Sequence, residues 1–154
     1  MRGKTPKRVI KPDSKYSSVN ISKFINQIMR RGKKSIAQKV VYNCFEIIKE
    51  KTKKDPLEIF DGAIKNVTPE VEVKGRRIGG GNYQIPVAVT GNRRNALAFR
   101  WIINAAKARK GVPMSQKLAD ELIAAYNKEG SAIKKRQDTY KMAEANRAFA
   151  HFAR

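Results

Sequence analysis

The sequence predicts a mainly α-helical fold with six helices and one extended β-hairpin between the third and fourth helices. Apolar residues recur at the spacing of a helix face in six separate segments. The period changes to two only between residues 71 and 89, on either side of three consecutive glycines. A length of 154 residues and an apolar share of 41% are enough for one domain with a hydrophobic core.

The first two helices are predicted from apolar stripes and boundary residues. The first stripe consists of Ile21, Phe24, Ile25 and Ile28. The second stripe consists of Ile36, Val40, Cys44, Ile47 and Ile48. Gly32 is the expected stop of the first helix, and Ser35 is the expected N-cap of the second.

The third helix has the strongest start signal in the chain. Asp55 can accept a hydrogen bond from the first turn, Pro56 suits the first helical position, and Glu58 stands where a capping-box acid reaches back. Its inward stripe consists of Phe60, Ala63, Ile64 and Val67, and Pro69 ends it.

A β-hairpin is predicted over residues 71–89, with Gly79, Gly80 and Gly81 at its tip. A two-stranded ribbon with few core residues is weakly stable alone, so we expect a projecting arm that becomes rigid against a nucleic acid. Arg76 and Arg77 are expected on opposite faces. An ordinary exposed turn is the alternative interpretation. Tyr83 adjoins the tip and is a candidate for stacking on a base.

Three helices are predicted after the hairpin, each with an inward stripe. The fourth begins near Asn92 and carries Leu97, Trp101 and Ala105 inward. The fifth is capped by Ser115 and carries Leu118, Leu122, Ala125 and Tyr126. The sixth begins near Ser131 and carries Met142, Ala145, Phe149 and Phe152.

The charge is strongly positive and unevenly distributed. Lys and Arg number 34 against 13 Asp and Glu, a formal net charge of +21. Such a chain calls for an anionic partner: nucleic acid, an anionic membrane surface or an acidic protein. No apolar run approaches the roughly 18 residues that span a bilayer, so we expect no membrane association. Acids cluster between residues 46 and 72 and are absent from 73 to 119, which predicts one mild face and one strongly positive face.

The candidate phosphate-binding residues fall into five groups. Residues 1–12 form a basic arm, expected to be flexible, before a single helical domain over residues 13–154, and it contributes Arg2, Lys4, Lys7, Arg8 and Lys11. The loop before the second helix contributes Arg31, Lys33, Lys34 and Ser35. The hairpin contributes Lys74, Arg76, Arg77, Gly79, Gly80, Gly81 and Tyr83. The fourth helix and its end contribute Arg93, Arg94, Arg100, Asn104, Lys107 and Arg109. The last helix contributes Lys134, Lys135 and Arg136.

The row on the fourth helix is the most specific of these groups. At 100° per residue, Arg93, Arg100, Asn104 and Lys107 lie within one narrow sector of the helix. A solvated helix face normally carries Glu as well as Lys, and this row has no acid. Arg can bind phosphate and stack on unpaired bases, which favours RNA as the ligand.

Catalysis, metals and cofactors are not expected. His151 is the only histidine and lies near the chain end, where a catalytic pair would be poorly anchored. Cys44 is the only cysteine, so an internal disulfide or a cysteine-based zinc cluster is impossible and a reducing compartment is favoured. The glycine run lacks the Lys-Ser/Thr that follows in nucleotide-binding loops.

Several motifs resemble the S-seven family of small-subunit ribosomal proteins, in order and over nearly the whole chain. They are the segments 24–26, 32–35, 55–58, 73–80, 83–87, 93–101, 134–136 and 142–151. The resemblance implies a six-helix bundle with one extended hairpin. It also implies binding to the 3′ major domain of small-subunit ribosomal RNA and nucleation of the subunit head. The implied neighbours are exit-site transfer RNA, messenger RNA and other small-subunit proteins. The spacing resembles the bacterial or organellar branch, so a cytoplasmic ribosome is expected and an organellar one stays open.

Two alternatives belong to other functional classes. An architectural DNA-binding protein would also be small, basic and equipped with a β-ribbon, but its ribbon needs an apolar wedge at the tip. Glycines occupy that position here. An enzyme acting on RNA would need catalytic groups that the sequence does not offer.

Overall fold

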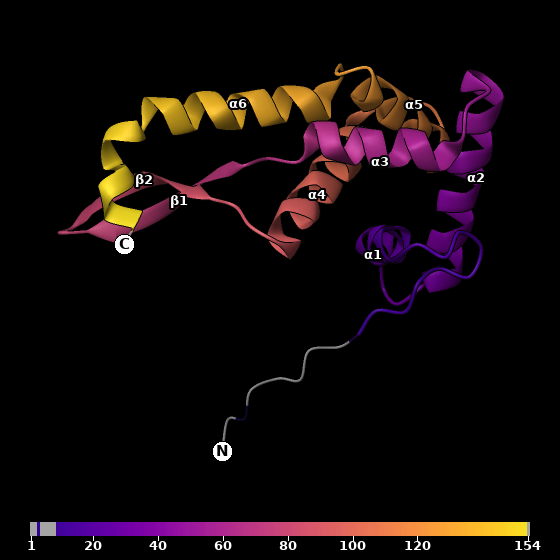
Figure 1. The fold of residues 1–154 in the computed structure, drawn as a ribbon, viewed down its shortest axis with the longest axis horizontal. Coiled ribbons are helices and arrows are strands. Elements are labelled where there is room, and N and C mark those ends of the chain that lie inside the picture. The colour runs from indigo at the N-terminus through magenta and orange to yellow at the C-terminus, as the bar shows by residue number, and fades with distance from the viewer. Residues whose placement is uncertain (1–2, 4–8, 154) are drawn as a thin grey trace. The chain divides into compact units, whose positions relative to one another are not determined.

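The computed structural model describes residue 3 and residues 9–153 (Figure 1). The described chain is mainly helical, with a two-stranded antiparallel hairpin after the third helix, as the sequence predicts. The elements are α1 (Val19–Ile28), α2 (Lys34–Thr52), α3 (Pro56–Val67), β1 (Val71–Ile78), β2 (Gly81–Ala88), α4 (Asn92–Ala108), α5 (Met114–Tyr126), α6 (Ser131–Ala145) and the 3-10 helix η1 (Arg147–Ala153). The 3-10 helix is a seventh helix in the described residues, one more than predicted.

The backbone forms two compact units, residues 1–41 and residues 42–154. In the first unit, Ile21, Phe24 and Ile25 are buried on α1 as predicted, while Ile28 is half-buried. Asp13 is buried and its Oδ2 accepts from the backbone N–H groups of Lys15 and Tyr16, which fixes the turn before α1. The prediction of one domain over residues 13–154 stays a prediction.

The predicted stripe of α2 is wrong in its first half. Ile36 is 55% exposed and Val40 is half-buried, while Ala37 and Val41 are buried. The reason is that apolar residues stand in adjacent pairs along this helix, so two stripes about 100° apart fit the same spacing. Ser35 lies inside the first turn of α2, which begins at Lys34, and is not the N-cap.

The core of the second unit is built on α3 and α4. The rings of Phe45 and Phe60 meet edge to face at 5.5 Å, and those of Phe60 and Phe99 are stacked at 6.4 Å. All four predicted stripe residues of α3 are buried, and Asp55 Oδ1 accepts from Leu57 N at 3.0 Å as an N-cap. No capping-box bond from Glu58 is observed among the described residues; its carboxylate accepts from the Tyr126 hydroxyl at 3.3 Å.

The hairpin is regular, with Val71 opposite Ala88 and Ile78 opposite Gly81. Its two-residue turn is Gly79-Gly80, and both have positive φ, 55° and 89°. That conformation matches the twist of a tight hairpin and favours glycine. Val89, predicted as the last strand residue, lies just beyond β2 and donates to the carbonyl of Glu70.

The predictions for the last two helices are partly wrong. Helix α5 begins at Met114 after Pro113, so Ser115 is not its cap, although Leu118, Leu122 and Ala125 are buried as predicted. Helix α6 begins at Ser131 as predicted but ends at Ala145. Met142 and Ala145 are exposed, because the buried face of α6 runs through Ala132, Ile133, Thr139 and Ala143 instead. The helix ends before Asn146, and η1 folds over the hairpin (Figure 1).

Candidate nucleic-acid interface

The pairing of the strands divides the hairpin into two faces. Arg76 pairs with Tyr83 and Lys74 pairs with Ile85, so these four side chains share one face. Arg77 pairs with Asn82 on the opposite face, where both are exposed. The expected opposition of Arg76 and Arg77 is therefore present.

The 3-10 helix covers part of the first face. The Tyr83 ring lies 5.2 Å from Phe149 and 5.7 Å from Phe152, centroid to centroid. Arg76 Nη1 donates to the Phe152 carbonyl at 2.9 Å. These contacts give the Tyr83 ring a packing role that the sequence did not predict, and its stacking on RNA stays a prediction.

Glu72 connects the base of the hairpin to α4. Its carboxylate is 10% exposed and lies 2.9 Å from Arg93 Nη2 and 3.1 Å from Lys74 Nζ. Burial by itself raises the pKa of Glu72, but the hydrogen bonds and charges of Arg93 and Lys74 outweigh burial and hold that pKa below its usual value.

The α4 row is exposed as predicted, at Arg93, Arg100, Asn104 and Lys107. Arg93 differs from Arg100 because its guanidinium is occupied by Glu72. Within residues 9–153, the side chain of Arg100 has no ion pair or hydrogen-bond partner. The structure thus adds an ion pair with Glu72 to Arg93, and the contact of Arg93 with RNA stays a prediction.

Three other predicted contact residues hold the fold together. Arg94 Nε donates to the Pro69 carbonyl at 3.3 Å. Arg136 Nη1 donates to the Asn66 carbonyl at 2.7 Å, and its guanidinium lies over the Tyr140 ring. Arg109 Nη2 donates to Glu121 Oε2 at 2.8 Å. Sequence alone does not reveal these partners, since each is far along the chain or on another element.

Glu121 is the buried acid behind Arg109. It is 0% exposed, and its Oε1 accepts from Ala132 N at 2.9 Å in the first turn of α6. A carboxylate at this place accepts a hydrogen bond from a free backbone N–H in the first turn of α6. The positive N-terminal end of the helix dipole stabilises its negative charge. Gly130 passes beside it with φ of 91°, and a Cβ there would lie 3.0 Å from Glu121 Oε1.

The basic loop of the first unit is exposed at Arg31, Lys33, Lys34 and Ser35. Arg31 and Gly32 both have positive φ, 51° and 72°, so the loop turns sharply before α2. A small groove of about 210 Å³ follows it, lined by Ile28, Met29, Arg30, Lys33, Ile36, Ala37 and Val40.

The remaining predicted residues either lie at the surface or fall outside the part of the chain that the structure describes. Lys134 and Lys135 are exposed on α6, as are Gly79 and Gly80 at the hairpin tip, while Gly81 is half-buried against Tyr83. Lys11 is exposed. Arg2, Lys4, Lys7 and Arg8 lie outside the described residues.

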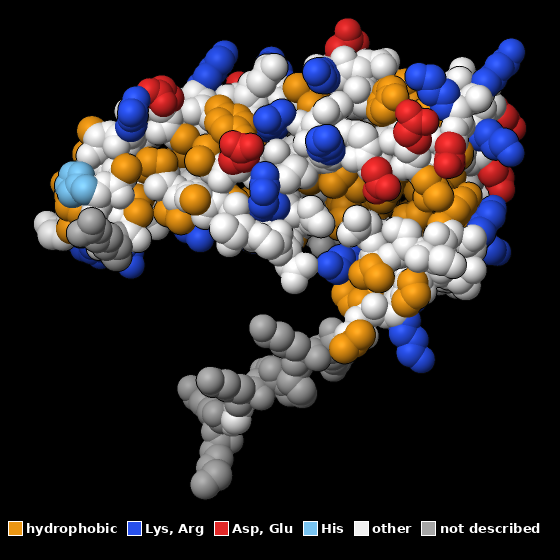
Figure 2. Space-filling model, viewed as in Figure 1, with side chains coloured by type: hydrophobic (Ala, Val, Ile, Leu, Met, Phe, Trp, Pro, Cys, Tyr) orange, Lys and Arg blue, Asp and Glu red, His pale blue; other side chains and the backbone are white. Residues whose placement is uncertain are grey.

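The surface of the second unit carries both signs on the face drawn in Figure 2. Acidic and basic side chains are interspersed there over α3, α5 and α6. This mixture is what we expect of the milder of the two predicted faces.

The described residues offer no group of His, Cys, Asp and Glu arranged to hold a metal ion. Cys44 is buried; burial raises the pKa of its thiol, and the charge of Asp120 raises it further, so the thiolate that would be a nucleophile is disfavoured. No helix in the described part of the chain is both long and apolar enough to span a bilayer.

Comparison with known proteins identifies the family. The family model described as ribosomal protein S7p/S5e matches residues 1–147. Small ribosomal subunit protein uS7 of Thermotoga maritima is 58% identical over 151 residues, which cover 98% of this chain and 97% of that protein. The proteins of the same name from Moorella thermoacetica and Chloroflexus aggregans are 56% and 52% identical, covering 97% and 98% of their own lengths. This chain belongs to the ribosomal protein S7p/S5e family, whose members are structural, non-enzymatic components of the ribosome.

Proposed function

We propose that this protein is a constituent of the small ribosomal subunit and binds the 3′ major domain of small-subunit ribosomal RNA. The observation that carries the proposal is the full-length similarity to small-subunit proteins, together with a net charge of +21. Phosphate neutralisation of an RNA by such a chain supplies most of the binding free energy.

The RNA contacts are assigned first to exposed cations that have no internal partner. Within residues 9–153 these side chains include Arg31, Lys33, Lys34, Arg77, Arg100, Lys134 and Lys135. They lie on a loop, a strand and two helices, so many separate phosphates are engaged. The α4 positions Arg100, Asn104 and Lys107 continue the row along one helix face.

A second set of cations has a divided role. Arg93, Arg94, Arg109 and Arg136 bind internal acceptors through part of the guanidinium. Arg has five N–H donors, so these side chains can hold the fold and still present donors to RNA. Substituting them changes stability as well as affinity.

Within the subunit, we propose that the protein nucleates assembly of the head. We place it beside exit-site transfer RNA and the messenger path, in contact with neighbouring small-subunit proteins. The sequence resemblance supports this assignment, and the exposed outer face of the hairpin around Arg77 supplies a surface for an RNA neighbour. A cytoplasmic ribosome fits the bacterial relatives.

An architectural DNA-binding role is the second candidate, because the chain is small, basic and has a two-stranded ribbon. Its hairpin turn consists of two exposed glycines, so it offers no apolar wedge to insert between base steps. RNA is therefore the better-supported ligand.

Footprinting distinguishes the two candidates. The full chain is bound at fixed salt to small-subunit ribosomal RNA or to duplex DNA with the same number of phosphates. We expect discrete protection in the 3′ major domain and tighter binding to the RNA. Equal affinity for both, without a discrete footprint, would contradict the proposal.

A further inference from the structure

A groove of about 210 Å³ lies where the end of α1 and the basic loop meet the first two turns of α2. All of its lining residues belong to the first unit, and we call it the α1–α2 groove. Pockets that enclose a drug-sized ligand hold roughly 300–1,000 Å³. The α1–α2 groove is smaller, so it suits one or two side chains of a partner macromolecule.

Ile36 and Val40 form an apolar wall of the groove that the fold leaves open. They stand four residues apart on one face of α2, a face that the sequence predicts as core. Ile36 is 55% exposed, and Val40 and Met29 are half-buried. Within the part of the chain that the structure describes, no large apolar side chain on a helix is more exposed than Ile36. A helical apolar stripe left open beside charged groups is typical of a contact with another protein.

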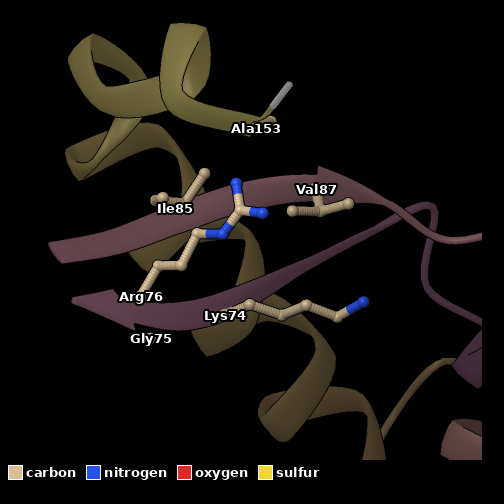
Figure 3. A pocket seen from close by; sticks show the side chains of 6 residues that line it. All are labelled: Lys74, Gly75, Arg76, Ile85, Val87 and Ala153. Atoms are coloured by element: carbon tan, nitrogen blue, oxygen red, sulfur yellow. The ribbon is translucent and has the colours of Figure 1, made fainter. Parts of the chain in front are cut away.

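The cations of the groove are available to a partner. Within residues 9–153, the side chains of Arg30 and Lys33 have no ion pair or hydrogen-bond partner. The sequence has no Asp or Glu between residues 14 and 45. The cavity beside the hairpin, drawn in Figure 3, differs because its Lys74 is already paired with Glu72. An occupant of the α1–α2 groove must therefore bring negative charge.

The chemistry of the groove favours an acidic protein segment over the other possible occupants. Unpaired bases are usually held by stacking on aromatic rings, and none of the described residues that line the groove is aromatic. Residues 1–12 of this chain carry five basic residues and no acid, and a second copy of the chain has the same net charge of +21. Like charges would oppose both of these occupants.

We infer that the α1–α2 groove binds an acidic amphipathic helix of a neighbouring small-subunit protein. An apolar side chain of that helix packs against Ile36 and Val40, in the manner of a helix bound in an apolar groove. Carboxylates about one turn away on the same helix pair with Arg30 and Lys33, which fixes its orientation. This inference rests on the proposed function and specifies the chemistry of one of the neighbouring proteins.

Photocrosslinking in reconstituted small subunits identifies the occupant. Two full-length variants carry a photoreactive phenylalanine derivative, one in place of Ile36 and one in place of Val19. Val19 is the matched control, because it is 41% exposed on α1 and does not line the groove. The probe at position 36 should crosslink to one protein segment that is rich in Asp and Glu and has apolar residues at helical spacing. The probe at position 19 should not reach that segment.

The other outcomes contradict the inference in distinguishable ways. Crosslinks from position 36 to RNA, to a basic protein segment or to a second copy of this chain would overturn the α1–α2 groove as a site for an acidic helix. The same holds if position 36 gives no crosslink in subunits that contain the variant. Failure of the unmodified chain to enter reconstituted subunits would overturn the proposed function and this inference together.

Substitutions measure what the apolar wall and the charge contribute. A synthetic peptide of the crosslinked segment is titrated with the full-length parent and with each variant, and thermal melts are recorded. Ile36→Ser should weaken peptide binding roughly 10- to 150-fold, as expected for burial of one aliphatic side chain, while Val19→Ser should not weaken it. Because both side chains are exposed, neither variant should melt early.

Arg30→Gln tests the charge, since Lys33 also belongs to the loop that we assign to RNA. It should weaken peptide binding roughly 2- to 5-fold, the range for an exposed ion pair. Lys39→Gln is its control, because Lys39 is exposed on α2 and does not line the groove. If Ile36→Ser melts early, the comparison of Arg30→Gln with Lys39→Gln decides the question. Peptide binding that is the same for the parent, Ile36→Ser and Arg30→Gln would overturn the inference.

Discussion

Glu72 is a nearly buried carboxylate between Arg93 and Lys74, and it links the first strand of the hairpin to the first turn of α4. If one of the two cations is removed, the buried carboxylate still carries the free-energy cost of desolvation but loses part of the electrostatic attraction that offsets this cost. The consequences of substitution at Arg93 and at Arg100 therefore differ, although both residues stand in the same exposed row.

Arg93→Ala should lower the free energy of unfolding by about 1 kcal/mol, a value that allows for the half-exposed guanidinium. Arg100→Ala should leave stability unchanged and weaken RNA binding, with the salt slope reduced by about 1. Denaturant unfolding and RNA titrations of both variants test this. An Arg93→Ala variant as stable as the parent, with only RNA binding reduced, would show that the Glu72 bridge contributes nothing to the fold.

The pH dependence of the free energy of unfolding should show the contribution of the Glu72 carboxylate. Its pKa is lowered in the folded state from the ordinary value of 4.5, so the unfolded state binds its proton first as pH falls. The stabilisation is therefore present above that ordinary value and is lost as pH falls through the folded pKa.

Denaturant unfolding of the parent and of Glu72→Gln across the acid range measures this contribution. The variant should lose less stability than the parent on acidification. Glu144→Gln is the control, because Glu144 is exposed on α6 and, within the described part of the chain, forms its ion pair with the exposed Arg147. Parallel curves for the parent and Glu72→Gln would contradict the assignment.

At the scale of elements, α3 is the segment that local sequence determines most completely. Asp55, Pro56 and the stripe from Phe60 to Val67 specify its start, its direction and its buried face without reference to other elements. Its cap can be tested separately from RNA binding.

Asp55→Ala should cost about 1 kcal/mol of stability, because the N–H of Leu57 loses its acceptor. Asp55→Ser retains an acceptor oxygen and should be close to the parent. RNA affinity should be the same for both. Equal melting of Asp55→Ala and Asp55→Ser would mean that the observed cap bond does not stabilise α3.

Other elements depend on tertiary contacts that the sequence does not encode locally. Apolar pairs such as Ile36-Ala37 permit two faces of α2, and packing chooses the one with Ala37. The sixth helix stops at Ala145 although its apolar spacing continues to Phe149 and Phe152. The rings of those two residues pack on Tyr83 of the hairpin, a contact between segments more than sixty residues apart in the sequence.

The candidate site, like the fold, can be predicted from the sequence only in part. The exposure of Arg77 and Arg100 follows from strand alternation and helix periodicity, so the sequence predicts it. The internal partners of Arg94, Arg109 and Arg136 are set by how helices pack, so periodicity does not reveal them.

Truncation of the hairpin tests its part in the fold. Replacing residues 75–84 by a short turn removes Tyr83 and the basic pair but keeps Ile85 and Glu72. The helical core around Phe60 should still unfold cooperatively, while η1 loses its contacts and RNA affinity falls. Thermal melting, proteolysis near Phe149 and RNA titration measure the three effects. A non-cooperative melt would show that the hairpin belongs to the core, and unchanged RNA affinity would show that it is only an exposed turn.

For the whole molecule, charge sets the energetics of binding. The net charge of the chain is +21. Among residues 9–153, basic side chains are exposed on both compact units, and several of them have no internal partner there. Binding is then a sum of many phosphate contacts, each of which releases counterions from the RNA. RNA affinity should therefore depend steeply on salt concentration.

The most direct measurement is the dissociation constant for a 3′ major-domain fragment, determined between 50 and 200 mM salt, beside duplex DNA with the same number of phosphates. With about 6–10 phosphates contacted, affinity for the fragment should fall roughly 10³- to 10⁵-fold over that range and exceed the affinity for DNA at every salt concentration. A flat salt response, or equal binding of the two nucleic acids throughout, would contradict the claim that this chain recognises small-subunit RNA through its phosphate backbone.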